Sequence, residues 1–439
     1  MTDAIKQRIE QINKGEIPNG YKKDRWLICP NNWTIERLNF YLSENKDKNV
    51  DGMYTKDDVL SVSGEYGVVN QIELMGRSYA GESILPYHIV ETGDIVYTKS
   101  PLKQNPYGII KLNEGKPGVV STLYAVYHCE NPIVAKYLNY FFQVDNYLNN
   151  YLLPLVKKGA KNDMKVNNED VLKGKISFPP LEEQQKIAEI LMQCDKIIEL
   201  YEQEIEEFKK LKKAYLRKMF PQKGKNVPEL RFDGFTDPWE QRKLSEVATM
   251  HARIGWQNLR TSEFLDSGDY MLITGTDFND GAINYSTCHF VERERYEQDK
   301  HIQIKNGSIL ITKDGTLGKV AYVQGLSMPA TLNAGVFNVK IKDETEVDNK
   351  YLFQYLKAPF LMDYVDKKAT GGTIKHLNQN ILVDFPILMT SKAEQEAIGV
   401  YFERLDNLIT LHQRKLEEQQ KQKKSLMQLL LTGIVRVKI

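Results

Sequence analysis

The chain has 439 residues, of which 41% are hydrophobic and 27% charged, which excludes a disordered or fibrous protein and suggests two or three domains. The net charge of +1 is low for a protein that binds DNA through Lys and Arg, so local positive faces or a partner would have to supply phosphate contacts. No apolar run approaches the roughly 20 residues of a membrane span, and the four cysteines form neither a C-x-x-C pair nor a disulfide framework. We therefore expect a cytoplasmic protein with buried thiols and no metal site.

The first two segments are a short helical start and a globular domain. Residues 1–19 have a polar helical pattern without a signal-peptide core. Residues 20–178 mix strand and helix patterns, which predicts a mixed α/β domain. Within it, Gly93 leads into the alternating apolar run Ile95-Val96-Tyr97-Thr98, which is typical of a strand.

A long helix is predicted over residues 179–220. The pair Phe178-Pro179 precedes it, since proline fits before a helix but not inside it. A helix from Leu181 to Met219 would be roughly 58 Å long, so it needs a partner along its length. Its apolar or nearly apolar residues recur in steps of three and four, as in a coiled coil: Ile187, Leu191, Cys194, Ile198, Tyr201, Ile205, Phe208, Leu211, Tyr215 and Met219.

A proline- and glycine-rich linker, residues 221–238, leads to a second globular domain, residues 239–386. The start of this domain resembles the start of the first, since Trp239 and Leu244 are spaced like Trp33 and Leu38. The strand run after Gly307 also resembles the run after Gly93. Between these points the two sequences diverge.

The C-terminal segment, residues 387–439, repeats the first long helix. A constant shift of 211 residues carries Glu183-Gln184 onto Glu394-Gln395 and Asp195 onto Asp406. His412 is interpreted as a tolerated polar residue in the seam. We expect the two helices to pack as an antiparallel pair that separates the domains; the alternative is that each helix packs only on its own domain. The predicted interface consists of Ile187, Leu191, Ile198, Ile205, Phe208, Ile398, Phe402, Leu405, Ile409 and Leu416.

Polar, mostly cationic loops in both domains are candidates for DNA contact, because glycine lets the backbone approach phosphates and Lys, Arg, Asn and Thr donate hydrogen bonds. The alternative for each single residue is an ordinary solvated surface role. The candidates of the first domain are Lys99, Lys103, Gln104, Asn105, Tyr107, Lys157, Lys158, Lys161, Asn162 and Lys165. Those of the second are Arg253, Gln257, Asn258, Arg260, Lys313, Asn333, Thr373, Lys375, His376 and Asn378.

Catalytic signatures are missing. The sequence has no G-x-x-x-x-G-K-[ST] phosphate loop, no H-E-x-x-H zinc motif, no G-x-S-x-G elbow and no clean dinucleotide fingerprint. Phe178-Pro179-Pro180-Leu181 lacks the polar first residue and the aromatic last residue of an amino-methyltransferase motif. No catalytic residue is therefore predicted.

These features together resemble the specificity subunit of type I restriction-modification enzymes over nearly the whole chain. The resemblance rests on Phe178 to Gln184 with the long helix that follows, on Phe385-Pro386-Ile387 with Glu394-Gln395, and on Pro228 to Phe235 before Trp239. The second copy departs from the family's Pro-Pro-Leu sequence before the helix, since Leu388-Met389-Thr390-Ser391 stands there.

The resemblance implies an α+β fold with two target-recognition domains and a non-catalytic role. Each domain would read one half of a split, asymmetric DNA site, and the helices would set the gap. Two methyltransferase subunits would bind S-adenosylmethionine and methylate adenine, and motor-nuclease subunits would use ATP and magnesium; this chain would bind no cofactor. The alternatives are the recognition part of an enzyme with its own methyltransferase or nuclease activity, and a coiled-coil scaffold that binds only proteins.

Overall fold

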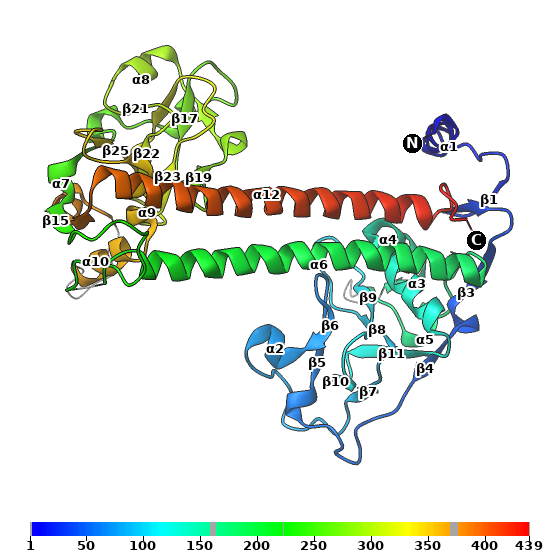
Figure 1. The fold of residues 1–439 in the computed structure, drawn as a ribbon. Coiled ribbons are helices and arrows are strands. Elements are labelled where there is room, and N and C mark those ends of the chain that lie inside the picture. Colours follow the sequence, from blue (N-terminus) through cyan, green and yellow to red (C-terminus); the bar gives the residue numbers. More distant parts are fainter. Residues whose placement is uncertain (1, 159–163, 223, 369–375, 439) are drawn as a thin grey trace. The chain divides into compact units, whose positions relative to one another are not determined.

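The computed structural model describes residues 2–158, 164–222, 224–368 and 376–438. The chain forms two compact units (Figure 1). The first unit comprises residues 1–201 and 415–439, and the second unit comprises residues 202–414. Two long helices, α6 (Leu181–Lys218) and α12 (Lys392–Leu430), cross this division, so each unit contains a part of both helices.

The first unit contains one four-stranded antiparallel sheet, in the order β4-β11-β8-β9, and several two-stranded ladders. Its strands are β1 (Tyr21–Asp24), β2 (Leu27–Pro30), β3 (Thr34–Arg37), β4 (Leu42–Asn45), β5 (Leu60–Ser63), β6 (Gly67–Asn70), β7 (His88–Val90), β8 (Ile95–Thr98), β9 (Ile109–Leu112), β10 (Gly118–Val120), β11 (Tyr124–Cys129), β12 (Lys157–Lys158), β13 (Met164–Lys165) and β14 (Lys175–Phe178). Its shorter helices are α1 (Asp3–Asn13), α2 (Gln71–Met75), α3 (Pro132–Gln143), α4 (Asp145–Leu152) and α5 (Asn168–Val171). Short 3-10 helices lie at Leu38–Phe40, Lys56–Asp58 and Leu153–Leu155.

The core of the first unit lies between this sheet, α3 and the long helices. All four residues of β8 are buried, because Ile95 and Tyr97 belong to this core and Val96 belongs to a second apolar cluster. Helix α3 starts where the Asn131 side chain accepts a hydrogen bond from the backbone N–H of Ile133, 3.0 Å, and it buries eight residues. Ile187 from the start of α6 and Leu430 from the end of α12 belong to the same core.

The second unit contains two four-stranded sheets. Its strands are β15 (Glu240–Lys243), β16 (Ala248–His251), β17 (Met271–Ile273), β18 (Phe278–Asn279), β19 (Ala282–Ile283), β20 (His289–Phe290), β21 (Gln303–Ile304), β22 (Ile309–Thr312), β23 (Val320–Tyr322), β24 (Ala330–Leu332), β25 (Val336–Ile341) and β26 (Pro386–Met389). Its shorter helices are α7 (Leu244–Val247), α8 (Arg293–Glu297), α9 (Asn349–Lys357), α10 (Phe360–Lys368) and α11 (Gln379–Val383). Its 3-10 helices lie at Gly255–Gln257, Thr261–Glu263, Gly275–Asp277 and Tyr285–Thr287.

One sheet of the second unit has the same plan as the sheet of the first. The order β16-β25-β22-β23 is antiparallel throughout, and β22 follows Gly307 as β8 follows Gly93. The second sheet, β20-β17-β24-β21, contains a parallel pair, β17 with β24, and shares an apolar cluster with Leu310 and Ala321 of the first sheet. This additional sheet occupies the segment in which the two sequences diverge.

The second long helix begins later than the predicted residue 387. Residues Pro386 to Met389 form β26, which pairs with β15 from Lys243 to Glu240. The equivalent pair in the first unit is β14 with β3. Backbone groups that are paired in a strand ladder are not available to a helix, so α12 starts only at Lys392.

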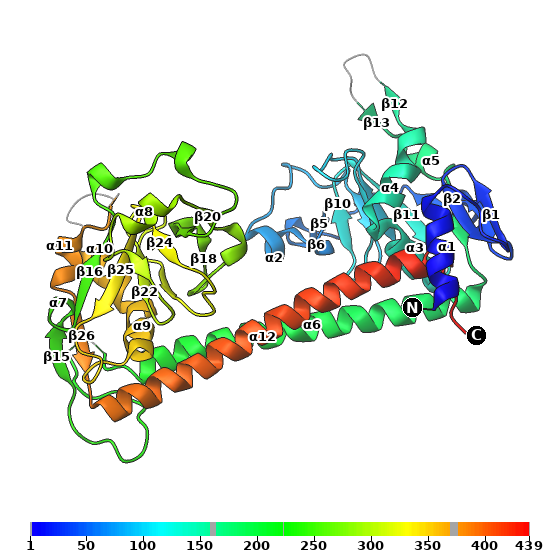
Figure 2. The same cartoon turned by 90° about the horizontal axis from the view of Figure 1, so that it is seen from above.

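The long helices run antiparallel in each unit, as predicted (Figures 1 and 2). In the second unit, Phe208 packs on His412 and Tyr215 packs on Tyr401, with ring centroids 5.2 and 5.5 Å apart. In the first unit, the ammonium group of Lys415 lies 6.0 Å from the centroid of the Tyr201 ring. Since the end of α12 also enters the core of the first unit, the alternative that each helix packs only on its own domain is wrong.

The predicted seam is mostly buried. Seven of its interface residues have at most 7% exposure: Ile187, Leu191, Ile205, Ile398, Phe402, Leu405 and Ile409. Ile198, Phe208 and Leu416 are half-buried. Leu211, which belongs to the apolar repeat but not to the predicted interface, is 39% exposed, and the neighbouring Lys212 turns inward to pair with Asp406.

The thiols of Cys29, Cys129 and Cys288 are buried, and Cys194 is half-buried; all four are free. Burial raises the pKa of each of these thiols. Within the described residues, no helix is both long and apolar enough to span a membrane. The same residues contain no group of three or more side chains suited to hold a metal ion.

Candidate nucleic-acid interface

A buried carboxylate fixes the start of each long helix. In the first unit, Glu183 is fully buried; it accepts a hydrogen bond from the indole N–H of Trp33 and two from the guanidinium of Arg436. In the second unit, Glu394 accepts two hydrogen bonds from Arg231, at 2.7 and 2.8 Å. Each arginine follows the end of the opposite helix, so these pairs tie the start of one helix to the segment after the other.

The glutamine after each buried glutamate forms hydrogen bonds with backbone carbonyls of the segment that precedes the helix. The side-chain amide of Gln184 donates to the carbonyl of Pro179, and that of Gln395 donates to Thr390 and Glu346. The repeated Glu-Gln pair therefore has a structural role at both helix starts. At the end of α12, Gly433 has a φ of +67°, and a Cβ there would lie 2.6 Å from Pro30, so only glycine allows this close turn.

The helices also carry a repeated ion pair. In the second unit, Lys212 donates to both carboxylate oxygens of Asp406, at 2.6 and 2.7 Å. In the first unit, Lys423 contacts Asp195, and the shift of 211 residues relates these two residues to the other pair. Burial, together with the charge of Lys357, lowers the pKa of Lys212 to about 8.

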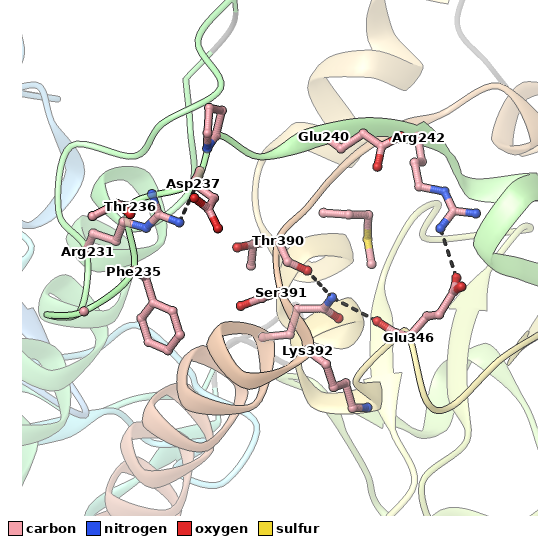
Figure 3. Close-up of a pocket in the computed structure, with 14 residues that line it drawn as sticks. Arg231, Phe235, Thr236, Asp237, Glu240, Arg242, Glu346, Thr390, Ser391 and Lys392 are labelled. Carbon is pink, nitrogen blue, oxygen red and sulfur yellow. Dashed lines mark hydrogen bonds and ion pairs between the residues drawn. The ribbon is translucent and has the colours of Figure 1, made fainter.

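A polar pocket of about 490 Å³ lies beside the start of α12 in the second unit (Figure 3). The segment 231–242 forms one wall, and Thr390, Ser391 and Lys392 form another. Arg231 is held by Glu394 and Arg242 by Glu346, while Lys392 donates to backbone carbonyls. The cationic groups of this pocket are therefore engaged by the chain itself.

Two DNA-contact candidates of the first unit lie exposed on one loop, namely Lys103 and Gln104. Asn105 is 95% buried and donates a hydrogen bond to Asp145, 2.9 Å, so the structure gives it a structural role in place of the predicted DNA contact. Tyr107 is half-buried against the core, and Lys99 is half-buried after β8. Lys157, Lys158 and Lys165 lie in the β12–β13 hairpin, whose side chains are not described, and Lys161 and Asn162 lie outside the described residues.

The second unit corrects two further candidates. Arg253 is 98% buried; it donates to the carbonyls of Leu332, Gln257 and Arg295 and to the side chains of Gln298 and Thr331, so it organises the loop rather than facing DNA. Gln257 is also buried.

The other candidates of the second unit are more accessible. Asn258, Arg260 and Asn378 are exposed. Lys313 lies over the ring of Phe337, Asn333 is half-buried, and His376 contacts Asp314 at 2.6 Å. Thr373 and Lys375 lie outside the described residues.

One cation–aromatic pair was not predicted. The Arg77 guanidinium lies 4.5 Å from the centroid of the exposed Tyr79 ring, on the loop after α2. Gln71 braces this loop by accepting a hydrogen bond from the backbone N–H of Tyr79, 2.6 Å. Sequence alone offered no signal here, because an Arg-Ser-Tyr run does not show that the two side chains meet.

Known proteins share both the sequence pattern and the fold. Residues 82–210 and 236–420 match the family described as type I restriction modification DNA specificity domain. The MjaVIII type I restriction enzyme specificity subunit of Methanocaldococcus jannaschii is 29% identical over 272 residues, which are 60% of this chain and 63% of that protein. The putative MjaX specificity subunit of the same organism is 25% identical over 437 residues, which are 95% of this chain and 97% of that protein.

A solved type I S subunit from M. genitalium matches with a TM-score of 0.54 at 16% identity, and the match covers 95% of this chain and 99% of that one. A chain from a type I restriction-modification assembly has a TM-score of 0.52 at 16% identity, covering 93% of this chain and 99% of that one. The chain therefore belongs to the family of type I restriction-modification DNA specificity subunits, which are non-catalytic recognition components.

Proposed function

We propose that this chain reads a bipartite, asymmetric DNA site and directs adenine methylation and restriction by partner subunits. The observation that supports it most is the duplication of the supporting structure: both units have the same helix-start carboxylate, ion pair and sheet plan, but different globular parts. Two different reading surfaces recognise two different half-sites, whereas identical surfaces would require a palindrome. The gap between the half-sites would then depend on the long helices.

The proposed partners are duplex DNA, two methyltransferase subunits and motor-nuclease subunits. S-adenosylmethionine, ATP and magnesium would bind to those subunits, and this chain would carry no cofactor. The relatives named above are specificity subunits of restriction enzymes, which supports such an assembly. The cytoplasmic location stays a prediction.

The function is tested by footprinting on genomic fragments with the cognate methyltransferase present. We expect two protected blocks separated by unprotected base pairs, with adenine methylation in both half-sites. The chain alone should transfer no methyl group. A single continuous block, or methyl transfer by the purified chain, would contradict the proposal.

Exposed apolar residues repeat on the two long helices and support the two-methyltransferase stoichiometry. Ile197 and Leu200 are 41% and 51% exposed, and the shift of 211 residues carries them onto Leu408 and Leu411, at 39% and 47%. A single exposed leucine needs no explanation, but the same exposed pair in both copies is the pattern expected of a surface that binds the same partner twice. We propose that each pair contacts one methyltransferase subunit.

Charge substitutions test this contact. Leu200→Glu alone should reduce the complex from two methyltransferase subunits to one, because it places a charge in one of two apolar contacts. The double variant with Leu411→Glu should bind none. Native mass spectrometry gives the stoichiometry, with the exposed, matched positions Lys196→Glu and Asn407→Glu as controls. Retention of two subunits by the double variant would contradict the contact.

A further inference from the structure

The first unit has a pocket of about 470 Å³ that the proposed DNA contacts do not use. Its walls are the turn between β5 and β6, the strand β9, the end of α3 and the two long helices. The pocket reaches the Lys423–Asp195 ion pair on the helices. Because its lining combines the buried Lys111 and the half-buried Lys423 with glycine turns, it is a candidate binding site.

Lys111, on β9, is the unusual group in this pocket. It is 91% buried and lines the pocket, and among the described residues its ammonium group has no hydrogen-bond acceptor or ion-pair partner. Burial, together with the charge of Lys423, lowers its pKa. Asp145 acts in the opposite direction, but its carboxylate accepts a hydrogen bond from Asn105. An unpaired buried cation is costly, so its retention points to a partner from outside the unit.

A second donor lies beside Lys111. Asn139 lines the same pocket and is 92% buried. Its side-chain oxygen accepts a hydrogen bond from the backbone N–H of Leu112, 3.2 Å, which leaves the amide NH₂ as the group that can donate. An ammonium and an amide NH₂ in one pocket suit an oxygen acceptor that carries negative charge.

In the second unit, a lysine near the repeated ion pair has a partner within the chain itself. There the ammonium group of Lys357, at the end of α9, lies 3.3 Å from the carboxylate of Asp280 and donates to the Asp280 carbonyl at 2.6 Å. Lys357 also lies 4.0 Å from Asp406, the equivalent of Asp195. The turn at Asp280-Gly281 thus supplies a carboxylate to Lys357, a lysine that lies near the Lys212–Asp406 ion pair. In the first unit, the lysine comes from β9 instead, and the turn between β5 and β6 lines the pocket without an ion pair to Lys111 among the described residues.

We propose that the pocket around Lys111 receives an acidic side chain of a protein partner, which plays the part that Asp280 plays in the second unit. The inference rests on the proposed function, in which methyltransferase subunits bind this chain. Glu65 and Glu114 also line the pocket. Their carboxylates can pair with a basic residue next to the acidic one, which a protein surface supplies and the phosphates of DNA do not, so a protein carboxylate fits better than a nucleic acid.

The test uses the full chain and its cognate methyltransferase subunit as the probe. Lys111→Met removes the charge, and Lys116→Met, an exposed lysine five residues later in the chain, is the matched control. We expect Lys111→Met to weaken binding of the methyltransferase at least tenfold, as measured by calorimetry, and to make that binding less sensitive to salt. The free chain should melt at a temperature a few degrees higher, since an unpaired buried charge is gone.

Three results would overturn the inference. If methyltransferase affinity is unchanged in Lys111→Met, the pocket does not bind this partner. If the preassembled complex instead loses affinity for duplex DNA while subunit association is unchanged, the occupant is a phosphate. If the free variant melts at a lower temperature, Lys111 already has a partner within the chain. The two-block footprint of the proposed function is a separate readout, so either idea can fail alone.

Discussion

Insertion of seven residues into each long helix should lengthen the gap of the recognised site by about three base pairs and leave both half-sites unchanged. A heptad adds about 10 Å of helix, and the rise of duplex DNA is about 3.4 Å per base pair. The insertions belong between Gln203 and Glu204 on α6 and between His412 and Gln413 on α12. These positions face each other, because Glu204 contacts His412 at 2.8 Å in the second unit.

Such an insertion preserves the observed contacts of both units. The Lys212–Asp406 pair stays on one side of the insertion, and the Lys423–Asp195 pair stays on the other. Mapping of methylated adenines in cells that carry the variant gives the half-sites and the gap together. An insertion in α6 alone is the control, and it should abolish methylation because the two seams fall out of register. Altered half-sites with an unchanged gap would show that the helices do not set the gap.

Replacement of Arg231 by methionine should destabilise the second unit by about 3–5 kcal/mol, because it leaves the carboxylate of Glu394 buried without a cation. Glu394 has a side chain only 1% exposed, and that of Arg231 is 12% exposed. Hydrogen exchange in α12 and β15 measures the change locally. Glu394 lies in the first turn of α12, the helix proposed to contact a methyltransferase subunit. The affinity for that subunit should therefore also fall.

The neighbouring pair provides the control. Arg242→Met breaks the contact with Glu346, whose side chain is 59% exposed, and should cost under about 1 kcal/mol (Figure 3). The double variant Arg231→Met with Glu394→Gln should recover part of the loss, because no unpaired charge then remains buried. Equal effects of Arg231→Met and Arg242→Met would show that burial of Glu394 does not matter.

The candidate site was less predictable than the helices. The sequence identified loops rich in Lys, Asn and Gly, but it did not distinguish a polar loop side chain that faces solvent from one that holds its own loop. Arg253 and Asn105 proved to be of the second kind. Long-range partners such as Leu332 and Asp145 decide this, and they lie 79 and 40 residues away. Lys111 was missed for the same reason, since its burial depends on α3 and the long helices.

The sequence by itself determined the duplicated helices and the two divergent domains, because a periodic apolar stripe and a constant shift of 211 residues can be read without knowing the fold. It favoured an antiparallel pair of helices, which the contacts in each unit confirm. Tertiary structure alone decided that α12 starts at Lys392, that Lys212 replaces Leu211 in the seam, and that arginines after each helix neutralise Glu183 and Glu394. The physical reason is that strand pairing and charge burial depend on residues distant in the chain. Only their contacts determine which backbone or charged groups find partners.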